Sequence, residues 1–142
     1  MFPPLKAYRE FIYRVNELSP HIIRSTLVFY TIGKATAIVT GQIEFTGDIV
    51  LVVAEVLSFA PDHRRIIRYG YEVWRGSEKL YWYDSQPHPD DPTLAATHPH
   101  HKHVSPDIKH HRIPAPDLSF ERPNLPFLIE EIERELLATD GE

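Results

Sequence analysis

The chain of 142 residues contains no cysteine and only one methionine. The absence of cysteine excludes disulfide frameworks, thiolate zinc sites and cysteine nucleophiles. The chain also lacks an apolar run near the roughly 18 residues that a membrane span needs, and it has no basic segment followed by an apolar one at its start. We therefore expect a cytoplasmic protein with no membrane association.

A large excess of positive charge, typical of proteins that coat nucleic acid, is also missing. The formal net charge is −5, from 15 Lys and Arg against 20 Asp and Glu. Residues 117–142 hold 8 acidic and 2 basic side chains, a net charge of −6. This segment alone is more negative than the whole chain. The main body is close to neutral, so it can still carry a local basic patch.

Length and patterning predict a single α+β domain over residues 1–142. Apolar residues at helical spacing predict an N-terminal helix within residues 1–18. Residues 21–84 are rich in β-branched and aromatic residues with short turns between them, which predicts an antiparallel meander of five to seven strands. The strands expected in this region are Ile22–Ile32, Lys34–Thr46, Ile49–Phe59, His63–Trp74 and Lys79–Asp84.

The predicted sheet is followed by a long segment rich in histidine and proline, residues 85–122. Nine prolines between Ser85 and Pro126 prevent a regular helix or a central strand, so we expect a functional loop with one short strand at Ile108–Ile113. An apolar stripe of helical period then predicts a C-terminal helix over residues 123–138. Its solvated side is expected to carry Glu130, Glu131, Glu133 and Glu135.

Histidines are concentrated in the predicted loop. Seven of the nine lie there: His88, His98, His100, His101, His103, His110 and His111. With a pKa near 6.5, these side chains can act as general acids, general bases or metal ligands at neutral pH. In an extended segment His101 and His103 point to one side. Composition leaves two kinds of site open, a divalent-metal site and a metal-free centre for RNA cleavage.

The metal site would use His98, His100, His101 and His103, completed by a residue such as Asp84 or His88. The metal-free centre would need no cofactor. Cleavage of RNA through its 2′-hydroxyl requires a base, an acid and a cation near the phosphate. Histidines can provide the first two, and the candidate RNA-binding cations are Lys102, Lys109, Arg112 and Arg68.

Three short motifs occur in a fixed order before the C-terminal helix. They are Tyr69-Gly-Tyr71, Tyr83-Asp84-Ser-Gln-Pro87-His88 and His98-Pro-His-His101-Lys-His103. Together they resemble the TumE family of toxins from prokaryotic toxin–antitoxin modules, over about residues 49–137. The resemblance implies a toxin that acts on RNA and is neutralised by an antitoxin from an adjacent gene. It also implies a catalytic set of Tyr71, Asp84, His88, His101 and His103.

Three positions depart from the pattern of that family. Trp82 stands where the family commonly has arginine, Ser85 where it has asparagine, and Gly70 where it has serine. Without that arginine, either another cation such as Arg68 substitutes for it or activity is reduced. The alternative to an endoribonuclease is a non-catalytic metal-binding or protein-binding module built on the histidine-rich loop, and a homodimer remains open.

Overall fold

The structure is a computed structural model that describes residues 1–85, 100–105, 107–108 and 111–137. Its helices are α1 (Leu5–Tyr13) and α2 (Leu125–Ile132), extended by a 3-10 turn (Val15–Leu18) and a π-helical turn (Glu133–Leu137), with a further 3-10 turn at Thr46–Asp48. Its strands are β1 (Ile22–Ser25), β2 (Val28–Ile32), β3 (Thr36–Phe45), β4 (Ile49–Ala60), β5 (His63–Arg75), β6 (Glu78–Asp84), β7 (His101–His103) and β8 (Arg112–Pro114). The predicted α+β fold with helices at both ends is confirmed.

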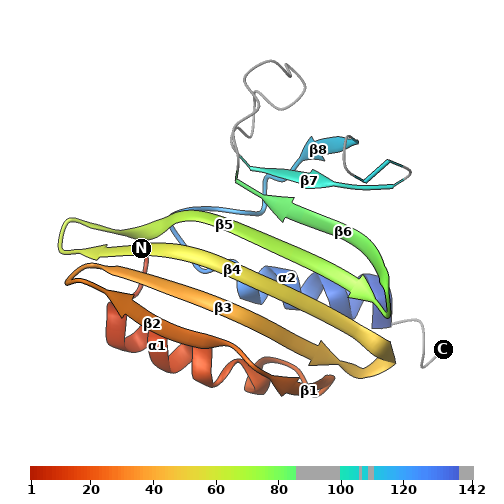
Figure 1. Cartoon of the computed structure of the whole chain (residues 1–142), viewed down its shortest axis with the longest axis horizontal. Coiled ribbons are helices and arrows are strands. Elements are labelled where there is room, and N and C mark those ends of the chain that lie inside the picture. The colour runs from red at the N-terminus through yellow and green to blue at the C-terminus, as the bar shows by residue number, and fades with distance from the viewer. Residues whose placement is uncertain (86–99, 106, 109–110, 138–142) are drawn as a thin grey trace.

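All eight strands form one antiparallel sheet in the order β1-β3-β4-β5-β6-β7-β8, with β2 also paired to β3 (Figure 1). Strands β3 to β6 form the expected meander. The count of eight arises because the first expected strand is two strands and because the histidine-rich segment contributes two more.

The first expected strand, Ile22–Ile32, is divided at Thr26. Strands β1 and β2 pair with successive parts of β3, on either side of Gly41. Gly41 has φ +135, and a Cβ at this position would lie only 2.6 Å from the carbonyl oxygen of Thr26. Glycine therefore lets the backbone of Thr26 approach β3 closely where the edge strand is interrupted.

Both helices pack on the same face of the sheet, as Figure 1 shows. From α1, the Tyr8 hydroxyl donates to Glu55 of β4, and Glu131 of α2 accepts from the Tyr83 hydroxyl of β6. Buried residues alternate along β4, and Ile49, Leu51, Val53 and Leu57 form part of the core under the helices. We call this face the helix side and the opposite one the far face.

Strands β7 and β8 lie within the segment predicted as a loop. The short strand expected at Ile108–Ile113 overlaps β8, which is shorter and begins later, since it spans Arg112–Pro114 and Ile108 lies in a turn before it. Strand β7 was not predicted. It pairs with β6 on one edge and β8 on the other, which is possible because residues 101–103 contain no proline. Pro114 is tolerated because it lies at the end of β8, the last strand of the sheet.

The C-terminal segment follows its predicted stripe with one exception. Leu125, Leu128, Ile129 and Ile132 are buried, as expected. Glu131 was expected on the solvated side but is only 6% exposed, because the Tyr83 hydroxyl and Lys102 both bond its carboxylate. Of the helices in the described part of the chain, none has the length and apolar character to cross a membrane.

Candidate functional site

The site forms where the histidine-rich segment returns to the sheet as β7 and pairs with β6. In this antiparallel pair His101 lies opposite Asp84, and His103 lies opposite Trp82. Side chains alternate along a strand and directly opposed residues share a face, so these four side chains lie together. They occupy the far face, because Tyr83 between Trp82 and Asp84 points to the helix side and bonds Glu131.

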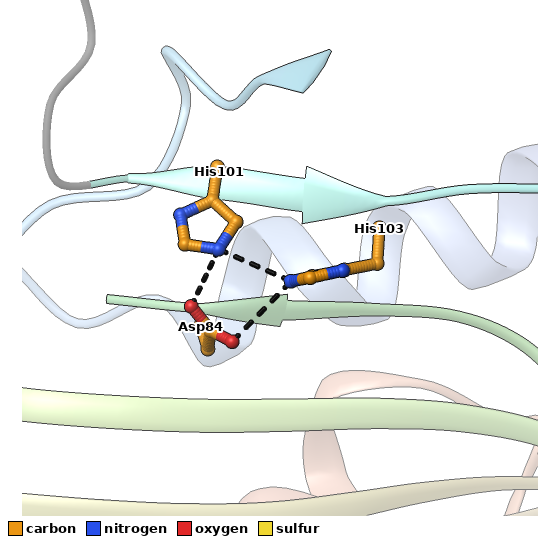
Figure 2. A group of neighbouring side chains, drawn as sticks. All are labelled: Asp84, His101 and His103. Carbon is orange, nitrogen blue, oxygen red and sulfur yellow. Dashed lines mark hydrogen bonds and ion pairs between the residues drawn. The ribbon is translucent and has the colours of Figure 1, made fainter. Parts of the chain in front are cut away.

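Asp84, His101 and His103 form a compact cluster (Figure 2). His101 Nε2 lies 2.6 Å from Asp84 Oδ1, and His103 Nε2 lies 3.4 Å from Asp84 Oδ2. The two Nε2 atoms are 3.1 Å apart. One carboxylate and two imidazoles therefore direct their polar atoms to a single point.

The cluster is covered on the histidine side and more open at the carboxylate. The side chains of His101 and His103 are 1% and 4% exposed, whereas that of Asp84 is 14% exposed. Gly70 pairs with Asp84 from the neighbouring strand, and a Cβ on it would meet no heavy atom of the described residues within 4 Å. The missing side chain of Gly70 leaves space next to Asp84 on the far face.

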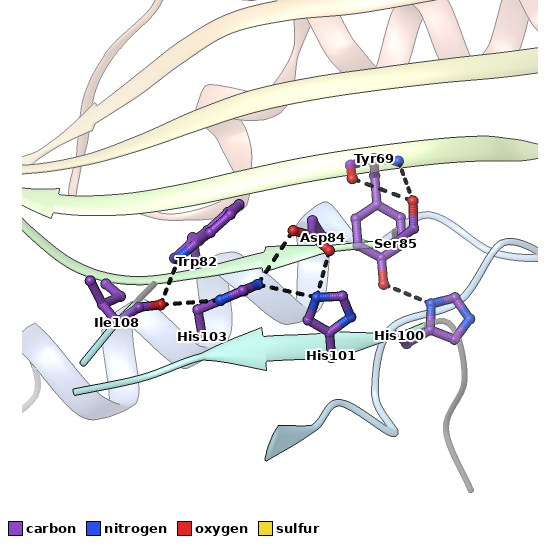
Figure 3. Close-up of polar contacts among 8 residues, drawn as sticks. All are labelled: Tyr69, Trp82, Asp84, Ser85, His100, His101, His103 and Ile108. Carbon is purple, nitrogen blue, oxygen red and sulfur yellow. Dashed lines mark hydrogen bonds and ion pairs between the residues drawn. The ribbon is translucent and has the colours of Figure 1, made fainter. Parts of the chain in front are cut away.

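His103 is held in one orientation and one tautomer. Its ring stacks on Trp82 with centroids 3.9 Å apart, and its Nδ1 lies 3.1 Å from the carbonyl oxygen of Ile108 (Figure 3). A carbonyl oxygen only accepts, so Nδ1 carries the proton and Nε2 of the neutral ring carries a lone pair. Burial lowers the pKa of His103 more than the nearby Asp84 raises it, which favours this neutral form.

His100 is separated from this cluster although it precedes His101 directly. Its Nδ1 lies 2.6 Å from the Tyr69 hydroxyl, and its ring stacks on Tyr69 and packs against Phe120. The four-histidine metal set expected from the sequence is therefore not assembled by residues 100–103. His88 and His98 lie outside the described residues.

Tyr71, expected in the catalytic set, lies in the core on the helix side. Its side chain is fully buried, its hydroxyl donates to Glu55 Oε2 at 2.5 Å, and it accepts from Asn124 Nδ2 at 3.2 Å. The hydroxyl of Tyr8 donates to the other Glu55 oxygen, also at 2.5 Å. The structure places Tyr71 in a buried network and not with Asp84.

Lys102, expected to bind RNA, points to the helix side because it lies between two residues of the far face. Its Nζ is 3.1 Å from Glu131 Oε2 and 4.2 Å from the centre of the Tyr81 ring. The Tyr83 hydroxyl donates to the same carboxylate. This charge is therefore neutralised in place by Glu131 and is directed away from the cluster.

Two expected cations do share the face of the cluster. Arg112 of β8 lies opposite His103, and its charge helps to lower the pKa of His103. Arg68 is exposed and lies two residues before Gly70, the partner of Asp84, so both residues face the same way. Lys109 lies outside the described residues.

Sequence reasoning missed the groups that support His103. Trp82 was noted as a departure from a family pattern, but in the structure its ring packs on His103 and its Nε1 donates to the Ile108 carbonyl at 3.2 Å. Trp82 and Asp84 are two residues apart in β6, as are His101 and His103 in β7. Once the pairing of β6 with β7 is known, this spacing predicts the contact between Trp82 and His103. No side-chain signal identifies the Ile108 carbonyl, because a backbone group looks the same at every position.

A family model described as "Toxin TumE" matches residues 11–136, which is most of the chain. The family expected from the three motifs is therefore confirmed. Neither the curated proteins nor the solved structures contain a match to the chain.

Proposed function

The chain belongs to the TumE toxin family, and from this premise we propose that it is a ribonuclease whose chemistry takes place at Asp84, His101 and His103. Membership of the family implies a toxin of a toxin–antitoxin module and an antitoxin as its partner. The action on RNA is the further step that we propose.

One observation carries the proposal. Three groups able to hold or move a proton at neutral pH converge within 3.4 Å, on the face of the sheet that carries Arg68 and Arg112. Cleavage of a phosphodiester needs a group to activate the attacking oxygen and positive charge near the phosphate. The far face therefore carries both kinds of group, with Arg112 directly opposite His103.

The geometry also restricts how the two histidines could work. In phosphoryl transfer the attacking and leaving oxygens lie on opposite sides of the phosphorus atom. The Nε2 atoms of His101 and His103 lie 3.1 Å apart and both face Asp84, so the two rings do not flank a phosphorus atom from opposite sides. Histidine acid–base chemistry in the proposed reaction therefore serves one reacting oxygen, with the two rings and Asp84 acting as a unit.

Induced expression of the wild type and of Asp84→Asn, with and without the antitoxin from the neighbouring gene, tests the proposal. Purified proteins are then incubated with single-stranded RNA and the products are resolved by length. We expect the wild type to arrest growth and cut RNA, and Asp84→Asn to do neither. His63→Ala, an exposed histidine at the start of β5, is the matched control and should behave as wild type. RNA left intact by a toxic wild type would refute the ribonuclease.

The low exposure of His101 and His103 favours a second candidate, a non-catalytic metal-binding or protein-binding module. In such a module the cluster stabilises the position of β7 and does not meet a substrate. A toxic Asp84→Asn variant that still binds the antitoxin and never cuts RNA would support this candidate.

A further inference from the structure

The cluster on the far face has the composition of a metal centre. Its three side chains offer one carboxylate oxygen and two imidazole nitrogens, and these atoms all lie within 4.8 Å of one another. We infer that Asp84, His101 and His103 bind one divalent transition-metal ion of the zinc and manganese class. The inference deepens the proposed function and rests on it only for the role of the metal in RNA cleavage.

The distances between the donor atoms fit ligation of a single ion. Metal bonds to imidazole and carboxylate are about 2.0–2.2 Å long, so neighbouring ligands of one tetrahedral or octahedral ion are roughly 3.0–3.5 Å apart. In the cluster the two Nε2 atoms are 3.1 Å apart, and the carboxylate oxygens lie 2.6 and 3.4 Å from them. The 2.6 Å contact is shorter than this range, so ligation of one ion requires the Asp84 oxygen to move away from His101 Nε2.

The groups that hold the His103 ring also resemble those that hold histidine ligands in metal sites. A metal-bound histidine donates its other ring N–H to a carbonyl or carboxylate, which fixes the tautomer and the ring orientation. The Ile108 carbonyl accepts from His103 Nδ1, and Trp82 holds the same ring by stacking (Figure 3). His103 therefore presents its Nε2 to the point where Asp84 and His101 also converge (Figure 2).

The balance of charge favours a cation at this point. The Ile108 carbonyl lies 3.1 Å from His103 Nδ1, so it is the Nε2 atom of this ring that faces Asp84 and His101. The carboxylate of Asp84 adds negative charge in a largely buried place. A divalent ion complements a carboxylate oxygen and two imidazole nitrogens that converge in this way.

Two histidines and one carboxylate leave coordination positions for water or substrate, as in catalytic metal sites. An ion held there lowers the pKa of bound water and polarises a phosphoryl oxygen. The two histidines would then be ligands, which explains why they are adjacent and not on opposite sides of a substrate. The set differs from the four histidines expected from the sequence, because His100 is bonded to Tyr69.

Metal binding can be tested without any measurement of activity. The full chain, prepared without a polyhistidine tag and stripped with a chelator, is titrated by calorimetry with Zn²⁺, Mn²⁺ and Mg²⁺ in separate experiments. Binding of Co²⁺ is followed by its visible absorption, which reports nitrogen and oxygen ligation. We expect one ion per chain for Zn²⁺ or Mn²⁺, with weaker binding of Mg²⁺.

Asp84→Asn and His103→Gln should each weaken this binding by about tenfold or more. His100→Ala is the matched control, since it removes a neighbouring histidine of the same segment, and it should leave the affinity unchanged. Circular dichroism of each variant without metal verifies that it is folded. Binding that is equally strong in wild type and Asp84→Asn, or an absence of saturable one-to-one binding, would overturn the metal site.

The proposed metal site and the proposed ribonuclease activity can be refuted independently. RNA cleavage that persists in excess chelator, in protein that takes up no metal, would remove the metal site and leave the ribonuclease in place. One-to-one binding that is lost in Asp84→Asn, in a protein that never cuts RNA, would leave the metal site in place and remove the ribonuclease.

Discussion

Two neighbouring rows of side chains cross β4 to β7 and face opposite sides of the sheet. The helix-side row is Val53, Tyr71, Tyr83 and Lys102, and the far-face row is Ala54, Gly70, Asp84 and His101. Residues of the first row are buried or paired under the helices. The second row begins with the small residues Ala54 and Gly70 and ends with Asp84 and His101 of the cluster. Neighbouring residues in one strand therefore belong either to the core or to the site.

Two carboxylates show what this difference means chemically. Glu55 is buried on the helix side and accepts from the hydroxyls of Tyr8 and Tyr71. Asp84 faces the Nε2 atoms of two imidazoles, at 2.6 and 3.4 Å. The first carboxylate accepts from two tyrosines of the core, whereas the second lies in the cluster for which we propose a metal ion.

The largest effect should come from exchanging each carboxylate for its amide. Asp84→Asn should lower RNA cleavage by roughly 10²–10⁴-fold, the usual contribution of a proton-transfer group, and should abolish growth arrest. Glu55→Gln keeps a hydrogen-bonding group in the core and should retain toxicity. Growth curves and RNA cleavage of both variants check this contrast, and equal losses in the two would contradict it.

Tyr71→Phe should affect stability and not chemistry. It removes a hydroxyl that bonds both Glu55 and Asn124 in the core, which should cost about 1–3 kcal/mol of unfolding free energy. Toxicity should persist while the protein stays folded. Urea unfolding measures stability, and growth arrest measures toxicity. A variant that is as stable as the wild type but not toxic would support a catalytic role for Tyr71.

Glu55 should make stability fall as the pH rises. Burial raises the pKa of Glu55 above its ordinary value of 4.5, so above that pH the unfolded chain ionises this group while the folded chain keeps it neutral. Stability should therefore decline from about pH 4.5 up to the folded pKa, by about 1.4 kcal/mol for each unit of the shift. Glu55→Gln should lack this decline, as chemical denaturation from pH 4 to 8 can show.

The smallest effect should come from Lys102→Met. Lys102 pairs with Glu131 in a partly buried place, so its loss should cost about 1 kcal/mol of unfolding free energy. RNA affinity and its salt dependence should stay as in the wild type, whereas Arg68→Ala and Arg112→Ala should reduce the salt slope. A reduced slope for Lys102→Met would show that this lysine contacts RNA after all.

Much of the fold follows from local patterns. The apolar positions of the two terminal helices repeat at helical spacing, and Tyr8 and Leu128 are buried as that spacing predicts. Alternation and short turns predict the meander from β3 to β6. The division between β1 and β2 does not follow from these patterns, because it depends on the close approach of Thr26 to Gly41.

The site follows from the sequence only in part. Asp84, His101 and His103 belong to the motifs on which the resemblance to the family was based, and their residue types indicate the chemistry that they can perform. The same motifs include Tyr71, and Lys102 lies between the two histidines, yet both residues point to the helix side. A motif records order along the chain, and it does not specify the face of the sheet that each residue occupies.

The sequence by itself determined the fold class, the family and the chemical groups available to the protein, because local periodicity and residue type need no partner to be recognised. Only the tertiary structure decided which of those groups meet. The register of β6 against β7 sets Asp84 opposite His101, and a shift of one residue would turn the histidines to the helix side. That register depends on contacts between segments distant in the chain, which no local pattern contains.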